Sequence, residues 1–311
     1  MKTKLSTLAL SLITLIGFFS ACTGQQQKAP TGETVTITHT LGTVQIPKNP
    51  QRVVVLDFSA LENLDYLGIQ PVGMPKSGVP SHLSKYANDK SIADVGTVVE
   101  VNLEKINELE PDLIIMGGRL QDFYDDLSSI APVLYPVVIN TTDFMGAFET
   151  VLNNMALIFD KQEEVDTALD KIRTRVTDIQ THTEASDHRA LILLHNRGRF
   201  SAYGSGSRFG IIHDLFGVKE AEPGMGVHLH GNPVSSEFIQ KVDPDIIYIV
   251  DRSQVVGNDV IDKDEIENKL VQQTQAAIHN RIIYLNPEVW YLAGGGVASV
   301  NMMMDEIEGA M

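Results

Sequence analysis

The chain contains an internal repeat, and this repeat constrains the fold more than any other feature of the sequence. Residues 102–106 lead to 110–115, and residues 235–239 lead to 243–248, in the same order and with the same spacing. Each copy predicts a short helix, a Pro-Asp turn and a strand buried on both faces. A constant offset of 133 residues aligns identical residues, among them Glu104 with Glu237, Ile106 with Ile239, Pro111 with Pro244 and Asp112 with Asp245.

Two copies this far apart do not build a solenoid, in which each repeat packs on the next. We therefore expect an α/β fold of two Rossmann-like lobes, each with a mainly parallel sheet. The lobes are expected over residues 34–142 and 185–311. The pattern predicts a hairpin over 35–47, strands over 52–56, 190–194, 246–250 and 282–285, and helices over 61–67, 207–216 and 297–311.

Residues 143–184 carry a long helical pattern between the two lobes. Apolar residues recur at steps of 4, 3, 4 and 3 from Val165 to Ile179, which is the spacing of one helix face. No proline interrupts this segment. A continuous helix of about 40 residues would be about 60 Å long at 1.5 Å per residue. We expect this one long helix to join the lobes as a rigid strut.

The amino terminus has the pattern of a signal peptide. Lys2 and Lys4 precede an uncharged, mostly apolar stretch over 5–19, which is too short to span a membrane. Phe19-Ser20-Ala21-Cys22 then resembles a bacterial lipobox, although Phe19 stands where a lipobox usually has leucine. An ordinary cleavable signal with an incidental cysteine is the alternative. The lipobox interpretation is favoured because Cys22 is the only cysteine in the chain.

This interpretation divides the amino-terminal region and predicts where the protein lies. Residues 1–21 are expected to be the lipoprotein signal peptide, and residues 22–33 a flexible tether. The mature protein would be lipid-anchored at Cys22, in the periplasm or on the outer face of the cytoplasmic membrane. The sequence leaves open whether the cell has one membrane or two.

The charge balance excludes several classes of function. Forty acidic residues against 24 basic ones give a formal net charge of −16, and removal of the signal peptide with its two lysines makes it −18. Such a charge argues against nucleic-acid binding and against peripheral binding to anionic lipid. A single cysteine also excludes an intramolecular disulfide framework and a cysteine-rich metal site.

The lipobox, the repeated Pro-Asp strands and the long connecting segment together resemble the helix-linked (class III) substrate-binding lipoproteins of ABC importers. Short motifs make the chain similar to the branch that binds ferric catecholate siderophores. These motifs are Ile114-Ile115-Met116-Gly117-Gly118-Arg119, Ser207-Arg208-Phe209-Gly210, His230-Gly231, Val250-Asp251-Arg252 and Trp290-Tyr291-Leu292. The resemblance covers essentially the whole mature chain. It implies a carrier and not an enzyme, with no intrinsic cofactor and an Fe(III)–siderophore complex as its ligand.

The same resemblance implies partners and leaves alternatives. A monomer would deliver its ligand to an ABC permease dimer with its ATPase. Haem, a corrinoid or another iron chelate is the alternative cargo. A surface-anchored hydrolase is a third possibility, but the chain has neither a Gly-x-Ser-x-Gly elbow nor a His-Glu-x-x-His helix.

Three arginines are the expected siderophore-binding residues. Arg119 and Arg252 each follow the carboxyl end of a predicted strand, at corresponding places in the two lobes, and Arg208 lies at a turn. Ligands bind at such strand ends in open α/β sheets, so these side chains are expected to converge on one cleft. A guanidinium stays charged and presents planar donors to flat oxygen pairs. The resemblance implies that these arginines contact catecholate oxygens.

The resemblance also implies iron ligands and docking residues. Tyr291 and His230 would complete the coordination of a tetradentate siderophore, and a hexadentate one would not need them. His228 is an alternative to His230, and the stretch 224–233 is expected to close over the ligand. Glu104 and Glu237 would dock onto the permease, one from each lobe. A stabilising glutamate at a helix amino terminus is the other interpretation of both.

Overall fold

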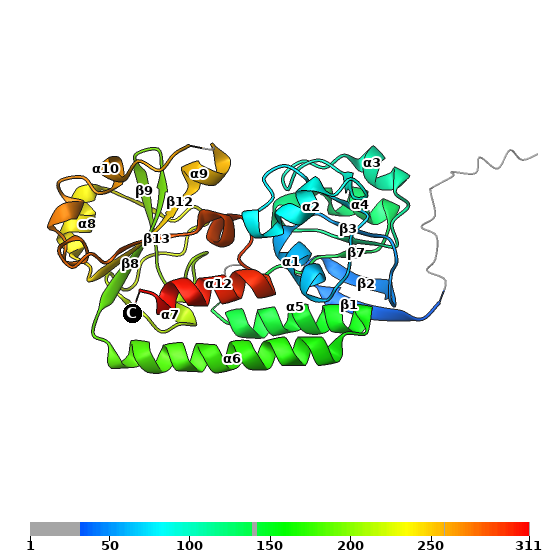
Figure 1. Ribbon diagram of the computed structural model, residues 1–311, viewed down its shortest axis with the longest axis horizontal. Coiled ribbons are helices and arrows are strands. Elements are labelled where there is room, and N and C mark those ends of the chain that lie inside the picture. Colours follow the sequence, from blue (N-terminus) through cyan, green and yellow to red (C-terminus); the bar gives the residue numbers. More distant parts are fainter. Residues whose placement is uncertain (1–31, 139–141, 258, 311) are drawn as a thin grey trace, which may run out of the picture.

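The computed structural model describes residues 32–138, 142–257 and 259–310, which form two α/β lobes side by side (Figure 1). The signal peptide, Cys22 and most of the predicted tether therefore lie outside the described residues. Within the described part of the chain, no helix is both long enough and apolar enough to cross a membrane.

The N-terminal lobe is built on a five-stranded parallel sheet in the order β5-β4-β3-β6-β7. The predicted hairpin precedes it as the antiparallel pair β1 (Thr34–His39) and β2 (Gly42–Pro47). The strands of the sheet are β3 (Val53–Val55), β4 (Gly73–Met74), β5 (Ala93–Asp94), β6 (Leu113–Ile115) and β7 (Val133–Leu134). The helices are α1 (Phe58–Tyr66), α2 (Ser84–Asn88), α3 (Leu103–Glu108) and α4 (Tyr124–Ile130), with 3₁₀ turns at Ser81–Leu83 and Gly118–Phe123.

The C-terminal lobe has a mixed sheet in the order β11-β9-β8-β12-β13, with β10 beside β8. Strands β8, β10, β12 and β13 run parallel, whereas β9 and β11 run antiparallel to their neighbours. The strands are β8 (Arg189–Asn196), β9 (Arg199–Tyr203), β10 (Lys219–Glu220), β11 (Asn232–Val234), β12 (Ile246–Asp251) and β13 (Ile282–Leu285). The helices are α7 (Ile211–Asp214), α8 (Ser236–Val242), α9 (Arg252–Val256), α10 (Lys263–Ile266), α11 (Gln275–Ile278) and α12 (Val297–Glu308), with a 3₁₀ turn at Val271–Gln273.

Residues 207–216 form less helix than the sequence predicts, because only α7 is helical there. The preceding turn is held by its own polar contacts. The Gly206 N–H donates to Asp214 Oδ2 at 2.7 Å, and the Ser207 hydroxyl donates to the Gly204 carbonyl at 2.5 Å. These hydrogen bonds compete with a first helical turn and leave Arg208 on a loop.

The internal repeat is confirmed as two equivalent helix–strand units, α3 with β6 and α8 with β12. Asn102 caps α3 by accepting the Lys105 N–H at 2.9 Å, and Ser235 caps α8 by accepting an N–H at 3.4 Å. After each helix the chain enters the left-handed region at the same repeat position, with φ of 42° at Glu110 and 47° at Asp243. The two copies therefore share caps and turns as well as residues.

The Pro-Asp pairs have a structural role in both lobes. Asp112 Oδ2 accepts the backbone N–H groups of Gln51 and Arg52 at 3.0 and 3.1 Å, at the entrance to β3. Asp245 Oδ2 accepts the N–H of Arg189, which begins β8, at 2.9 Å. Each aspartate thus fixes the start of the central strand beside its own, which sets the register of the sheet.

The prediction of one continuous helix over 143–184 is wrong. The segment forms α5 (Phe144–Phe159) and α6 (Gln162–Ala185), and the chain reverses at Asp160, where φ is 55°. Glu149 and Arg173 form an ion pair at 2.8 Å, although 24 residues of continuous helix would separate them by about 36 Å. The apolar periodicity continues across the break because both helices bury a face. Only α6 crosses from one lobe to the other (Figure 1).

The last helix, α12, lies at the junction of the two lobes. It packs on α1 of the N-terminal lobe and on α6. The Val297 N–H at the start of α12 donates to the Asn63 side chain on α1 at 3.0 Å. The two lobes are therefore joined by α6 on one side and by the α1–α12 contact in the middle (Figure 1).

Candidate functional site

A π-helical turn, Glu288–Leu292, carries Tyr291 between the two lobes. We call this segment the Tyr291 turn. Its wide i to i+5 hydrogen bond runs from the Ala293 N–H to the Glu288 carbonyl at 3.2 Å. π-helical turns are rare and are frequently found at functional sites. The sequence analysis did not predict this turn, because apolar spacing cannot distinguish a single π turn from an α turn.

The three predicted arginines converge on Tyr291. Arg119 and Arg208 both donate to the Tyr291 carbonyl, at 2.7 and 2.6 Å. Arg252 Nε donates to the Tyr291 hydroxyl at 2.8 Å. The Arg208 guanidinium also lies over the Tyr291 ring, 4.2 Å from its centroid. A single tyrosine thus collects three cationic groups from both lobes.

The fold explains why two of these arginines meet. Arg119 follows β6 and Arg252 follows β12, and the offset of 133 residues that relates the two repeats also relates these two positions. Both therefore leave the carboxyl end of a central parallel strand. Gly117 is needed before Arg119, because a Cβ there would lie 2.3 Å from Asp57 Oδ2. Asp57 in turn caps α1 by accepting the Ala60 N–H at 3.0 Å.

Other side chains support this cluster and were missed by sequence reasoning. Asn196, the last residue of β8, accepts a hydrogen bond from Arg252 at 3.3 Å. The buried Tyr203 ring packs edge-on against Phe209, which adjoins Arg208, with centroids 4.7 Å apart. No motif marks either residue, because their roles arise from pairing between distant segments. Only the strand-end position of Asn196 offered a signal.

The charge around Tyr291 changes its acidity. Burial alone would raise the pKa of the Tyr291 hydroxyl, but the hydrogen bond from Arg252 and the charges of Arg208, Arg252 and Arg119 outweigh it and lower that pKa below 10. Burial lowers the pKa of Arg208, and the nearby charge of Arg119 adds to this effect. The arrangement favours an anionic oxygen among the arginines.

We expect this effect to be visible in a titration of the ligand-free protein. The ultraviolet difference spectrum between wild type and Tyr291→Phe should show one phenolate forming below pH 10. The unfolded chain keeps the ordinary pKa, so the stability advantage over Tyr291→Phe should grow as pH rises from the folded-state pKa to 10. A transition at pH 10 or above would contradict this expectation.

The two candidate histidine ligands, His228 and His230, are exposed in the loop before β11. Gly231 fixes the end of this loop, with φ of 71° and a virtual Cβ only 2.6 Å from the Tyr203 ring. Hydrogen bonds thus join the three arginines to Tyr291, and among the described residues no hydrogen bond joins His230 to this cluster.

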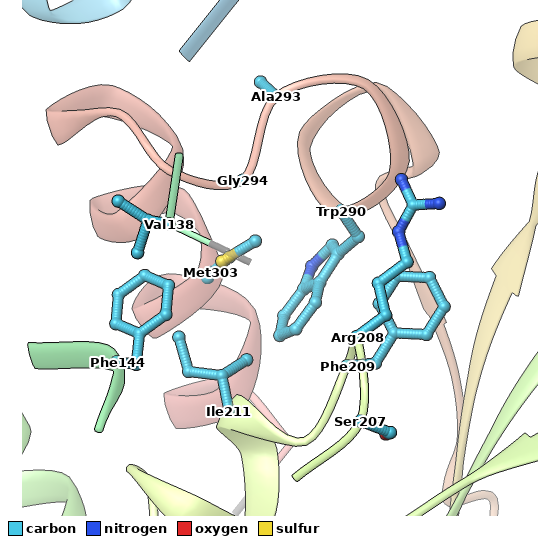
Figure 2. Close-up of a pocket in the computed structure, with 10 residues that line it drawn as sticks. All are labelled: Val138, Phe144, Ser207, Arg208, Phe209, Ile211, Trp290, Ala293, Gly294 and Met303. Carbon is cyan, nitrogen blue, oxygen red and sulfur yellow. The ribbon is translucent and has the colours of Figure 1, made fainter. Parts of the chain in front are cut away.

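A small cavity of about 50 Å³ lies directly behind the Tyr291 turn (Figure 2). Trp290, 3% exposed, points into this interior and donates to Glu306 Oε2 at 2.6 Å. Figure 2 shows Arg208 extending past the apolar residues toward the turn that carries Trp290. The other lining residues include Val138, Phe144, Phe209, Ile211 and Met303. Trp290 therefore faces the core, whereas the adjacent Tyr291 faces the arginines.

Among residues 32–138, 142–257 and 259–310, no group of three or more His, Cys, Asp or Glu side chains is arranged to hold a metal ion. The converging groups are guanidinium donors and one phenol, which suit an anionic, oxygen-rich molecule.

Comparison with known proteins decides the family. Residues 53–289 match the periplasmic binding protein family. This chain is a periplasmic binding protein. The match covers both lobes and α6, and it confirms the family resemblance and the two-lobed α/β fold expected from the sequence.

Similar periplasmic binding proteins are named for siderophores. The chain is 36% identical to the petrobactin-binding protein YclQ of Bacillus subtilis over 98% of each chain, and its fold matches that crystal structure with a TM-score of 0.87 over 90% of this chain and 99% of the other. It is 35% identical to the ferric-anguibactin-binding protein FatB of Vibrio anguillarum, over 96% and 94% of the two chains. The catecholate-siderophore binding protein VctP of Vibrio cholerae is 30% identical, with a TM-score of 0.85 over 89% and 100%.

Proposed function

We propose that this periplasmic binding protein captures a ferric catecholate siderophore between its lobes and delivers it to an ABC permease dimer with its ATPase for iron uptake. The observation that carries the proposal is the convergence of Arg119, Arg208 and Arg252 on Tyr291. A chain of net charge −16 concentrates three cations in one place, against its own field. An anionic ligand supplies the reason for such an arrangement.

Catecholate chemistry fits the donors of this cluster. Fe(III) is a hard cation that prefers oxygen ligands, and catecholates provide them as flat, negatively charged pairs. A guanidinium presents two parallel N–H donors to such a pair. Relatives named for petrobactin and anguibactin support a siderophore as the ligand class. In this proposal the protein acts as a carrier without catalysis or an intrinsic cofactor.

Tyr291 is the proposed iron ligand of the protein. Its lowered pKa favours the phenolate, which is a hard oxygen donor. A histidine of the 228–230 turn would supply a second ligand when the siderophore leaves two coordination positions open. His230 is preferred because Gly231 and Tyr203 fix the chain directly after it. In this proposal the exposed loop that carries His230 closes on the bound ligand.

The remaining roles concern delivery. Glu104 and Glu237 are exposed in the first turns of α3 and α8, at equivalent positions on different lobes (Figure 1). We assign them to docking on the permease, one from each lobe. Cys22 would carry the lipid that holds a monomeric protein at the outer face of the cytoplasmic membrane.

The proposal predicts selective quenching of Trp290 fluorescence. Trp290 is the only tryptophan in the chain and adjoins Tyr291. Titration with a ferric bis-catecholate should quench its emission strongly, whereas a ferric hydroxamate, haem and cobalamin should not. Absence of any response to ferric catecholates would reject the proposal, and a response to haem or cobalamin alone would change the cargo.

A second measurement tests the iron ligand. We expect Tyr291→Phe to change the visible phenolate-to-iron absorption of the bound complex. Tyr66→Phe is the matched control, because Tyr66 is 40% exposed on α1 and its hydroxyl donates to the Glu164 carbonyl, away from the three arginines in sequence. An unchanged spectrum in Tyr291→Phe would remove Tyr291 from the iron.

A further inference from the structure

Three polar residues of α1 hold the start of α12, which comes from the other end of the chain. The Gly295 N–H donates to Ser59 Oγ at 3.2 Å, and the Val297 N–H donates to Asn63 Oδ1 at 3.0 Å. Glu62 accepts the Ser299 N–H at 2.8 Å and also the Ser299 hydroxyl. These contacts satisfy backbone donors that a helix cannot satisfy by itself.

Glu62 is the central residue of this contact. It is only 1% exposed. A Cβ at position 296 would lie 2.3 Å from Glu62 Oε2 and 2.7 Å from the Ser59 carbonyl, so only glycine fits there. The carboxylate also faces the amino terminus of a 12-residue helix, where a negative charge is favoured. Burying a carboxylate is costly, so this position calls for an explanation.

A second segment of the N-terminal lobe, which contains Ser81 and His82, contacts both Glu62 and the Tyr291 turn. His82 Nε2 lies 2.8 Å from Glu62 Oε1, and the neighbouring Ser81 contacts Glu288. The Ser81 N–H and hydroxyl both reach Glu288 Oε2, at 2.8 and 2.6 Å. Glu288 is the first residue of the Tyr291 turn. Ser81 therefore binds the first residue of the Tyr291 turn, and Glu62 binds Ser299, which follows the turn in the chain.

Tyr291 lies in the chain between Glu288 and Ser299, the two residues that these contacts hold. Arg119, from the same lobe as Ser81 and Glu62, donates to the Tyr291 carbonyl at 2.7 Å. The segment 288–299 follows β13 of the C-terminal lobe, yet the N-terminal lobe holds it at Glu288, at Tyr291 and at 295–299. The position of Tyr291 relative to Arg119 is thus set by both lobes.

We propose that Glu62 and Ser81 are positioning residues that fix the Tyr291 turn against Arg119, and so set the geometry in which the ligand meets both lobes. The inference rests on the proposed function for the identity of the ligand. It goes beyond that function by assigning a role to residues that do not touch the ligand. Neither residue belongs to the motifs by which the sequence resembles siderophore-binding proteins.

The test uses Glu62→Gln and Ser81→Ala in the full-length protein. Glu62→Gln removes the charge and keeps the side-chain size. Ser81→Ala removes one hydroxyl donor from an exposed residue, so we expect it to fold as the wild type does. Glu149→Gln is the matched control, because Glu149 pairs with Arg173 far from the Tyr291 turn. The readouts are the affinity for a ferric bis-catecholate, the phenolate-to-iron absorption, and the pH titration of Tyr291 without ligand.

We expect Glu62→Gln to bind about tenfold more weakly and Ser81→Ala about threefold more weakly, with an altered absorption band in both. Without ligand, the Tyr291 titration should move toward higher pH in both variants, because the phenol is less closely held among the arginines. Unchanged affinity and an unchanged titration in both folded variants would overturn the inference. If wild type binds no ferric catecholate but the titration still moves, the proposed function fails and the positioning role stands.

Discussion

Arg208→Ala is expected to weaken the binding of a ferric bis-catecholate by about 100-fold. Arg208 contacts Tyr291 twice, by a 2.6 Å hydrogen bond to its carbonyl and by stacking 4.2 Å from its ring. In the proposed function Arg208 pairs with the anionic ligand, and truncating one partner of such a buried charge pair between protein and ligand costs about 3 kcal/mol, which corresponds to roughly 100-fold in Kd. Fluorescence titration of Trp290 measures the change.

The chain offers matched controls for this experiment. Arg173→Ala removes the same charge from α6, where Arg173 is about half exposed and pairs with Glu149 and Asp170. Its affinity should stay within about twofold of wild type, because exposed charges contribute little at a distance. The affinity of Arg208→Lys should lie between those of Arg208→Ala and Arg173→Ala, since lysine keeps the charge and loses the planar donor pair. Equal losses for Arg208→Ala and Arg173→Ala would show that net charge alone governs binding.

Phe148→Ala is expected to lower the free energy of unfolding by about 3–5 kcal/mol, the usual cost of removing a buried aromatic ring. Phe148 is fully buried on α5 and stacks on Phe144, with ring centroids 5.9 Å apart. It belongs to the apolar core that α5 and α6 share with both lobes. Denaturant unfolding followed by circular dichroism measures the loss.

Leu157→Ala is the control on the same helix. Leu157 is 51% exposed, so its truncation creates no cavity and should change stability by less than about 0.5 kcal/mol. Similar losses for both variants would mean that α5 does not bury the face described above. A small loss for Phe148→Ala alone would mean that the core refills the space.

The sequence predicted those parts of the fold that depend on local patterns. The repeat predicted two helix–strand units, and the buried apolar runs located β3, β8, β12 and β13. The rule that ligands bind at strand carboxyl ends brought Arg119 and Arg252 to one place. Arg208 and Tyr291 came from family motifs, and their contact with the other arginines followed from no pattern in the chain.

The features that were missed depend on contacts between distant residues or on a single backbone angle. The break between α5 and α6 rests on Asp160, an aspartate in the left-handed region where glycine is the usual signal. The pairing of Glu62 with Ser299 joins residues 237 positions apart. The second sheet also contains the antiparallel strands β9 and β11, which the sequence did not predict. Strand β9 follows β8 through a tight turn at Arg197 and Gly198, which have φ of 50° and 75°. None of these has a periodic signature.

The repeat relation between Arg119 and Arg252 means that two of the four residues of this site are copies of one position in the repeat. Each lobe contributes one guanidinium, which follows the equivalent central strand of that lobe. Arg208 and Tyr291 have no such copies, because Pro75 and Ile158 stand 133 residues earlier. In the proposed function, a ligand with two like arms would meet equivalent partners in both lobes, while Arg208 and Tyr291 would favour one of its two orientations.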